Sequence, residues 1–431
     1  MSHFAYQDGV LHAEELPLAA LAAQFGTPLY VYSKAALLEN YRAYADACRR
    51  HGRGDDTALV CYSVKSNSNL AVLDVLARAG SGFDIVSGGE LLRVIAAGGD
   101  PAKVIFSGVG KGRDEMRLAL THGIACFNVE SIAELHRLNE VAGAMGRRAP
   151  VSLRVNPDVD AQTHPYISTG LKENKFGVAY DEALACYRTA ATLPHIDVTG
   201  IDCHIGSQLL DDAPLLAALD KVIELIDRLE AEGIPIAHLD IGGGIGITYD
   251  DERPVAVGDY LARLFARVDG WRAEKYAGRP IKVLFEPGRS IVGNAGLLLT
   301  EVQYLKHGAD KNFAIVDAAM NDLMRPAMYQ AWHCVQPVVP RAEATDGARV
   351  YDVVGPVCES GDWLARERQL ALQAGDLLAI MSAGAYGMTM ASNYNTRGRP
   401  AEVLVDGARA HLVRRREAAA ELFALESVLP K

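Results

Sequence analysis

The sequence predicts an α/β protein that combines a (β/α)8 TIM-type barrel with a C-terminal, mostly-β domain. Eight short apolar runs alternate with amphipathic stretches between residues 29 and 289, which is typical of a parallel sheet closed on itself. Polar residues gather where those runs end, at the rim where barrels carry out chemistry. After Arg289 the runs become strand-like and turn residues separate them. A doubly wound open sheet is the alternative for the first region.

The chain divides into three segments under this interpretation. Its 431 residues exceed the size at which a single core stops growing, so we expect two domains. Residues 1–28 contain a short strand or hairpin and then a helix that Gly26 and Pro28 end, and we expect them to join the β domain. Residues 29–289 form the barrel and residues 290–431 form the C-terminal β domain.

The expected barrel strands are near-continuous apolar runs that end in polar or glycine residues. They are 58–65, 82–88, 104–110, 125–131, 151–157, 199–207, 238–246 and 282–289. The stretches between them, such as 131–146 and 215–233, space their apolar residues as helices do. The expected strands of the second domain are 297–307, 312–320, 349–360, 375–387 and 401–413.

Composition limits the partners and the compartment. The net charge is −11 and no long basic run occurs, so we expect neither nucleic acid nor a membrane as the partner. Seven cysteines are scattered without a CxxC pair, which favours free thiols in the cytoplasm. The N-terminal residues lack the pattern of a signal peptide, and no uncharged apolar stretch is long enough for a membrane helix.

Lys65 is the first candidate for chemistry. It ends the run ALVCYSVK and precedes the polar residues 66–69, so its amine can leave the strand end and reach into a cavity. Such an amine can form a Schiff base with an aldehyde cofactor. A strand that ends in a solvated lysine is the alternative.

Three later strand ends carry further candidates. Gly242, Gly243 and Gly244 follow an apolar strand, where their backbone N–H groups can converge on a phosphate or simply form a tight turn. His204 and Ser207 end the sixth strand, and a flat imidazole there can stack on a planar cofactor or be a structural residue. A zinc site is not indicated, because no second ligand lies at zinc spacing from His204.

The last barrel strand ends in the segment 286–289, EPGR. A carboxylate at Glu286 can keep a heteroaromatic ring nitrogen protonated, or can pair with Arg289 and cap a turn. The planar fork of Arg289 suits a carboxylate or a phosphate.

The second domain adds three short motifs. Arg325 and Tyr329 are four residues apart and share a face on a helical turn. The segment 358–362, CESGD, places a thiol beside a carboxylate at a strand end, and the glycines of GAYG (384–387) expose a tyrosine ring. Each motif alone is unspecific, but together they suggest groups brought to one site.

In combination, these motifs resemble the pyridoxal-phosphate-dependent decarboxylases that have an alanine-racemase-like barrel. The resemblance extends over nearly the whole chain through YSVKSN, HIGSQ, DIGGGIG, EPGR, the 325–329 segment, CESGD and GAYG, in that order. The family usually has alanine where this chain has Ser66, which leaves the role of the lysine intact and changes the local turn.

The resemblance implies a role for each candidate residue. Three residues are expected to be catalytic. Lys65 would form an internal aldimine with pyridoxal 5′-phosphate, and the His204 ring would stack on the pyridine. Cys358 would donate a proton after carbon dioxide leaves. The cofactor shell is expected to contain Lys65, Asp84, Arg154, His204, Ser207, Gly242, Gly243, Gly244, Glu286, Pro287, Gly288, Arg289 and Tyr386. The substrate residues are expected to be Arg289, Arg325, Tyr329, Glu359 and Tyr386.

The resemblance also implies a homodimer with shared active sites, because Cys358 and Glu359 are expected to enter from the partner subunit. Two arginines and a tyrosine suit a carboxylate at the far end of the substrate, while Glu359 suits an ammonium group there. An amino acid with both groups fits meso-diaminopimelate, whose decarboxylation gives lysine in the last step of lysine biosynthesis.

Three alternatives stay open at this point. A related decarboxylase could act on carboxynorspermidine or on a basic amino acid. A racemase could use the same barrel, although it would need a base on the opposite ring face and no CESG element. A non-catalytic cofactor-binding protein could also use it, although such a protein would need no second β domain.

Overall fold

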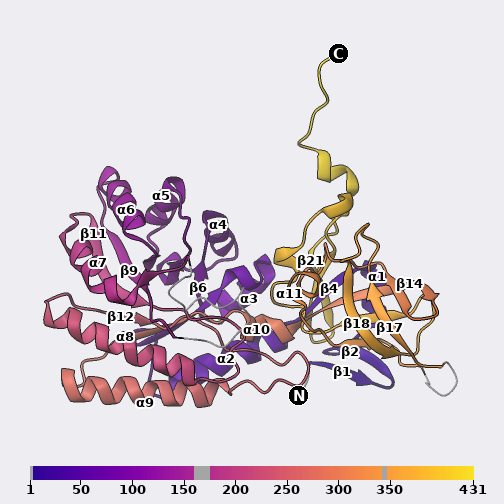
Figure 1. The fold of residues 1–431 in the computed structure, drawn as a ribbon, viewed down its shortest axis with the longest axis horizontal. Helices are drawn as coiled ribbons and strands as arrows, with labels where there is room; N and C mark the ends of the chain where they lie inside the picture. The colour runs from indigo at the N-terminus through magenta and orange to yellow at the C-terminus, as the bar shows by residue number, and fades with distance from the viewer. Residues whose placement is uncertain (1–2, 160–174, 342–346) are drawn as a thin grey trace. The chain divides into compact units, whose positions relative to one another are not determined.

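The computed structural model describes residues 3–159, 175–341 and 347–431. These residues form two compact units (Figure 1). Unit 1 contains Met1–Leu37, Thr248–Glu252 and Val292–Lys431, and unit 2 contains Leu38–Ile247 and Arg253–Ile291. Among the described residues no helix combines the length and the apolar character that crossing a membrane requires.

Unit 2 is a closed parallel barrel. Its eight strands pair in the order β5-β6-β7-β8-β9-β11-β12-β13, and β13 pairs again with β5 to close the ring. The strands are β5 (Ala58–Ser63), β6 (Gly82–Ile85), β7 (Val104–Phe106), β8 (Cys126–Val129), β9 (Ala149–Asn156), β11 (Ile196–Asp202), β12 (His238–Asp240) and β13 (Lys282–Phe285). Each lies within or overlaps one of the eight predicted runs, so the predicted barrel is confirmed and the open sheet is excluded.

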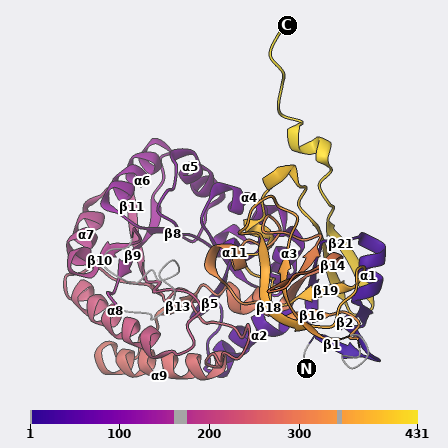
Figure 2. The same cartoon turned by 45° about the vertical axis from the view of Figure 1, so that its right-hand side comes forward.

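Helices cover the outside of the barrel (Figure 2). They are α2 (Lys34–Arg50), α3 (Leu70–Arg78), α4 (Gly88–Ala96), α5 (Arg113–His122), α6 (Ile132–Ala144), α7 (Tyr180–Thr192), α8 (Ala213–Ala231) and α9 (Val257–Tyr276). The short helix α10 (Arg289–Val292) follows β13. The short strand β10 (Val178–Ala179) pairs with β9 outside the ring. The apolar side of α8 is buried at helical spacing, from Leu215 to Leu229, which is what holds an amphipathic helix on a sheet.

Serine side chains begin two of these helices next to the strand ends. Ser87 accepts from the backbone N–H of Glu90 at 3.2 Å, and the Glu90 carboxylate accepts in return from the N–H of Val86. Ser131 and Glu134 repeat the same arrangement at α6. These capping interactions fix how the chain leaves each strand, and therefore fix the rim on which the candidate residues lie.

Unit 1 is mostly β. Its main sheet has the order β18-β17-β15-β14-β4-β20-β21, with β19 paired to β14 and β16 paired to β19. Strands β1, β2 and β3 form a small separate sheet. The elements are β1 (Phe4–Gln7), β2 (Val10–Ala13), β3 (Leu16–Pro17), α1 (Leu18–Phe25), β4 (Leu29–Ser33), β14 (Gly296–His307), β15 (Asn312–Val316), α11 (Arg325–Tyr329), β16 (Val335–Pro337), β17 (Arg349–Val354), β18 (Trp363–Leu370), β19 (Leu377–Ile380), β20 (Ala401–Asp406) and β21 (Arg409–Arg414).

Two of the differences between the structure and the sequence prediction in unit 1 concern how strands pair. We placed 29–289 in one barrel segment, but β4 pairs with β14 and β20 and so lies in the sheet of unit 1. Residues 401–413, which we read as one strand, form a hairpin of β20 and β21 in which Asp406 pairs with Arg409. Gly407 has a φ of +60° there, as a tight hairpin turn requires.

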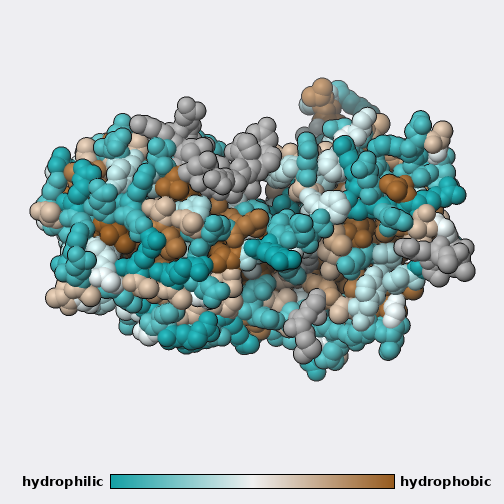
Figure 3. Space-filling view, turned by 60° about the horizontal axis from the view of Figure 1, so that its bottom comes forward, coloured by the Kyte–Doolittle hydropathy of each residue, from teal (hydrophilic) through white to brown (hydrophobic). Residues whose placement is uncertain are grey.

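The surface of the molecule is mainly hydrophilic in the view of Figure 3, with apolar residues scattered over it. Apolar side chains are concentrated and almost fully exposed near the end of the chain, at Leu425, Val428 and Leu429. Figures 1 and 2 show this end of the chain extending away from the sheet of unit 1.

We predict that Gly200→Ala destabilises the barrel. A Cβ atom at Gly200 would lie 2.0 Å from Nε2 of the buried His238 on the neighbouring strand, and such overpacking costs roughly 1–3 kcal/mol. Gly270→Ala is the matched control, because a Cβ atom on this exposed face of α9 meets nothing within 4 Å. We expect it to raise the free energy of unfolding by roughly 0.5–1 kcal/mol. Urea unfolding measures both, and equal stabilities would contradict the packing described for β11 and β12.

Candidate active site

Lys65 lies directly after β5, in a single 3-10 turn formed by Val64–Ser66. Its Nζ donates to Oδ2 of Asp84, on the neighbouring strand β6, at 2.9 Å, and the Ser63 hydroxyl donates to the same oxygen at 2.6 Å. The Lys65 side chain is 36% exposed, whereas that of Asp84 is fully buried. An anchored carboxylate therefore holds an accessible amine at the carboxyl end of the strands.

Ser66 is buried inside the turn that carries Lys65. Its Oγ lies 2.7 Å from the Ser63 carbonyl oxygen and 3.0 Å from the Tyr62 hydroxyl. An alanine could make neither contact. The serine therefore adds hydrogen bonding to the turn without displacing the lysine from the rim.

His204 follows β11 and is a neutral ring. The backbone N–H of Gly243 donates to His204 Nδ1 at 3.3 Å, so the ring proton resides on Nε2. Burial, together with the positive charges of Arg154 and Lys65, lowers the pKa of His204 well below its usual value. The imidazole therefore stays uncharged at neutral pH, as a ring that stacks on a flat partner should.

The glycines after β12 pack closely against the end of β13. A Cβ atom at Gly243 would lie 2.2 Å from the Glu286 carbonyl oxygen, and Gly242 and Gly244 have φ of +68° and +121°. The N–H of Glu286 donates to the Gly242 carbonyl at 2.7 Å. Only glycine permits this approach and these backbone angles, which brings the glycine loop and the 286–289 turn together.

The 286–289 turn also contacts β5 and the segment that follows β11. The backbone N–H of Ser63 donates to the Pro287 carbonyl at 3.0 Å, and a Cβ atom at Gly288 would lie 3.0 Å from that of Ser63. Nε and Nη2 of Arg289 each lie 3.2 Å from the Ser207 hydroxyl. A hydroxyl and a guanidinium side by side are a donor pair suited to a phosphate or a carboxylate.

Three buried carboxylates lie below the rim. Oxygen atoms of Asp202, Asp240 and Glu286 all lie within 4.8 Å of one another. Burial, and then the charges of the neighbouring carboxylates, raise the pKa of Asp202 and of Glu286 well above the usual values. Burial raises the pKa of Asp240 to about 7. Like charges so close in an apolar interior cannot all ionise, so this cluster binds protons that separate carboxylates would have lost at the same pH. The same spacing would accept a cation, but an acidic cluster alone does not establish one.

Sequence reasoning missed several residues that support this site. Glu130 accepts from Arg154 Nη1 at 3.2 Å and from two backbone N–H groups, and Arg154 Nη2 donates to the His204 carbonyl at 3.4 Å. The Glu286 carboxylate accepts from the Ser107 hydroxyl at 3.3 Å and from the Asn128 amide at 3.4 Å. The available signal was position alone, since each residue lies in or just after a barrel strand.

The remaining predicted site residues belong to unit 1. Arg325 and Tyr329 begin and end the short helix α11. The Cys358 thiol is exposed, whereas five of the other six cysteines are buried, and the Cys358 N–H donates to Asn395 Oδ1 at 2.9 Å. The side chain of its neighbour Glu359 accepts a hydrogen bond from Tyr394. Tyr386 has a φ of +55°, a strained angle that is frequent at functional positions.

The rim of unit 2 fits pyridoxal phosphate in three respects. Lys65 offers an amine for an aldehyde, Glu286 offers a buried carboxylate for a ring nitrogen, and Ser207 with Arg289 offers donors for a phosphate. Asp84 Oδ1 and Asn128 Oδ1 are buried, and nothing within the described ranges donates to either of them. Such polar atoms usually accept hydrogen bonds from a ligand or from water, so this part of the barrel is suited to a polar ligand.

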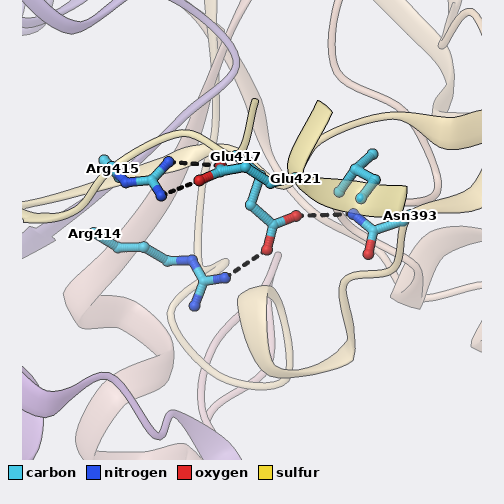
Figure 4. Close-up of a pocket in the computed structure, with 6 residues that line it drawn as sticks. Asn393, Arg414, Arg415, Glu417 and Glu421 are labelled. Atoms are coloured by element: carbon cyan, nitrogen blue, oxygen red, sulfur yellow. Dashed lines mark hydrogen bonds and ion pairs between the residues drawn. The ribbon is translucent and has the colours of Figure 1, made fainter. Parts of the chain in front are cut away.

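A pocket in unit 1 carries no such chemistry (Figure 4). It is lined by Asn393, Arg414, Arg415, Glu417, Glu421 and Leu422. Arg414 donates to Glu417 at 2.8 Å, and Arg415 donates to Glu421 at 2.7 Å. Its charges therefore neutralise one another within the pocket, and we assign no catalytic role to it.

Comparison with known proteins agrees with this geometry. The model of the family described as "Pyridoxal-dependent decarboxylase, pyridoxal binding domain" matches residues 38–293. Over the full length of both chains, the sequence is 61% identical to the diaminopimelate decarboxylase of Pseudomonas aeruginosa and 58% identical to that of Vibrio cholerae.

Solved structures of two further relatives have the same fold. The diaminopimelate decarboxylase of M. jannaschii in co-complex with L-lysine superposes with a TM-score of 0.92 at 38% identity, covering 99% of this chain and 98% of its own. That of Helicobacter pylori, complexed with L-lysine, superposes with a TM-score of 0.88 at 40% identity, covering 95% of this chain and 99% of its own. Both the barrel and the β unit of the chain are therefore shared with these proteins.

We predict that Asp240→Asn flattens the dependence of stability on pH. The folded protein keeps a proton on Asp240 up to a pKa of about 7, whereas the ordinary value is 3.8. Wild-type stability should therefore fall between about pH 4 and pH 7, because the unfolded chain binds fewer protons there. Asparagine can still accept from the Gly242 N–H, as Asp240 does at 2.9 Å.

The variant should therefore gain stability over the wild type as pH rises, by roughly 1–3 kcal/mol between pH 5 and pH 8, at about 1.4 kcal/mol per pKa unit. Urea unfolding without added cofactor measures this difference. A constant difference across that pH range would rule out the protonated state assigned to Asp240.

Proposed function

This chain belongs to the diaminopimelate decarboxylase family of pyridoxal-dependent decarboxylases, and from that premise we propose that it converts meso-2,6-diaminopimelate into L-lysine and carbon dioxide. The observation that carries this proposal is the pairing of an accessible Lys65 with the buried Asp84 at 2.9 Å, inside the region that matches the pyridoxal-binding family. The reaction is the last step of lysine biosynthesis. The seven free cysteines favour a reducing cytoplasm as its location.

Lys65 is the residue that we propose to bond the aldehyde carbon of the cofactor. When bound, the pyridoxal ring supplies an electron sink, which makes the loss of carbon dioxide from an amino acid accessible. Glu286 would hold the ring nitrogen, and the neutral His204 would pack against the ring face. Ser207, the glycines 242–244 and the 286–289 turn would hold the phosphate, and Asp84 and Arg154 would complete the shell.

We propose that residues of unit 1 select and protonate the substrate. Arg325, with Tyr329 and Arg289, would bind the distal carboxylate, because a guanidinium fork matches a carboxylate. Glu359 would bind the distal ammonium group, and Tyr386 would contact both cofactor and substrate. The exposed thiol of Cys358 would deliver one proton to the carbon that has lost carbon dioxide.

A homodimer with shared active sites is part of the proposal. Cys358 and Glu359 are both exposed, as groups that enter a partner's site should be. The exposed apolar side chains of Leu425, Val428 and Leu429 are also typical of a contact with another chain. A decarboxylase for a basic amino acid is a weaker candidate, because its substrate would offer Arg325 no distal carboxylate.

We predict that Lys65→Ala abolishes the conversion of meso-diaminopimelate into L-lysine and carbon dioxide. It should also abolish the visible absorbance band of the bound cofactor, because that band comes from the cofactor bonded to the Lys65 amine. Lys103→Ala is the control, since Lys103 pairs with the exposed Asp55. A wild-type protein that binds the cofactor but leaves meso-diaminopimelate unchanged would refute the substrate assignment.

We predict that Cys358→Ala keeps the cofactor band but lowers turnover roughly 10²–10⁴-fold, the usual contribution of a positioned proton donor. Cys334→Ala, at a half-buried thiol in the same unit, should leave turnover unchanged. Steady-state rates and absorbance spectra of the three proteins make the comparison.

Mixed subunits then test whether the sites are shared. If Lys65 and Cys358 of different subunits form one site, unfolding and refolding Lys65→Ala with Cys358→Ala should restore part of the wild-type turnover. If each site lies within one chain, the mixture should show no more turnover than the Cys358→Ala protein alone.

A further inference from the structure

A buried cluster in unit 1 surrounds the guanidinium group of Arg325. His333 Nε2 lies 3.0 Å from Arg325 Nη1, and the Tyr249 ring lies below the guanidinium, 4.8 Å from Cζ to the ring centroid. His333 and Tyr249 also contact each other edge to face, with ring centroids 5.3 Å apart. All three residues are at least nine-tenths buried, so this arrangement is a packed part of the unit.

The hydrogen bonds of His333 determine its protonation state. Its Nδ1 lies 2.8 Å from the Met381 carbonyl oxygen, which can only accept, so Nδ1 carries a proton. Arginine can only donate, so Nε2 must carry a lone pair. Both contacts exist together only in the neutral Nδ1–H form of the ring.

The His333 imidazole adds no negative charge beside the guanidinium of Arg325. Arg154, the buried arginine of the barrel rim, is instead paired with the carboxylate of Glu130 at 3.2 Å. A carboxylate partner would neutralise a guanidinium and weaken its attraction for a second anion, whereas an imidazole orients the group and adds no negative charge. The hydrogen bond fixes the direction of the guanidinium, and the Tyr249 ring fixes its plane.

Tyr249 comes from the segment that follows the glycines of β12. Its backbone N–H and that of Asp250 both donate to Glu252 Oε2 at 2.8 Å, and the Thr248 hydroxyl donates to the Glu252 carbonyl at 2.7 Å. These bonds make Thr248–Glu252 a small self-supporting loop. The loop therefore presents the Tyr249 ring in a defined orientation.

We propose that His333 and Tyr249 are positioning residues that hold Arg325 in the orientation in which it recognises the distal carboxylate of the substrate. The inference rests on the proposed function, because it assigns Arg325 to that carboxylate. It adds a requirement for a neutral acceptor at position 333 and an aromatic face at position 249.

The test compares KM and kcat for meso-diaminopimelate among variants of the holoenzyme. His333→Leu removes the acceptor and should raise KM about tenfold, as expected for a hydrogen bond to a charged group, with kcat changed less than about threefold. His333→Gln retains an amide oxygen as acceptor and should recover most of the affinity. Tyr249→Leu should raise KM in the same manner. His307→Leu, the same change at an exposed histidine of unit 1, should leave KM unchanged.

A double-mutant cycle shows whether His333 acts through Arg325. If it does, His333→Leu should add nothing to the effect of Arg325→Ala, because the coupling is lost with either partner. Inhibition by L-lysine, which retains the carboxylate, and by cadaverine, which lacks it, gives a second readout. His333→Leu should weaken inhibition by L-lysine about tenfold and leave that by cadaverine unchanged.

Additive effects in the cycle, or equal loss of inhibition by both compounds, would overturn the positioning role. If His333→Leu gives no soluble holoenzyme, His333→Asn replaces it, because its shorter amide does not reach Arg325. A wild-type enzyme without turnover of meso-diaminopimelate would instead refute the proposed function, so the two failures are distinguishable.

Discussion

The cost of burying charge at the carboxyl ends of the barrel strands is the constraint on which this structure depends. Asp84, Asp202, Asp240 and Glu286 are almost fully buried there, although an ionised carboxylate strongly prefers water. The protein offsets this cost in two ways. Oδ2 of Asp84 accepts hydrogen bonds from Lys65 and Ser63, whereas the raised pKa values of the other three groups favour their protonated forms. A closed barrel brings these four carboxylates close together, because the carboxyl ends of all its strands lie on one rim.

The buried groups Arg154, His204 and Arg325 differ in the charge of the partners that orient them. Arg154 in the barrel is paired with a carboxylate, that of Glu130. His204 and Arg325 are instead oriented by partners that carry no charge. His204 is kept neutral by a backbone donor to Nδ1, and Arg325 is met by a neutral imidazole. The chemistry proposed for the site needs an uncharged stacking ring and a fully charged arginine, and these partners favour both.

Much of this could be predicted from the sequence, because the barrel strands are apolar runs with polar ends. The runs located all eight strands, and with them Lys65, His204 and the glycines. Strand β18 was missed since its sequence, WLARERQL, alternates charged residues on an exposed face. Strand β4 was assigned to the barrel because a buried apolar run, LYVYS, does not reveal which sheet it joins. Glu130 offered only its position after a barrel strand and His333 was not singled out, since their importance comes from partners that are distant in the sequence.

The central claim is that the amine of Lys65 binds the aldehyde of pyridoxal phosphate at the rim of the barrel. The direct measurement is borohydride reduction of the protein with the cofactor present, followed by digestion and mass spectrometry of the peptides. The account predicts one irreversible cofactor adduct, on the peptide that contains Lys65. An unmodified Lys65 peptide, or an adduct on another lysine of the chain, would contradict it.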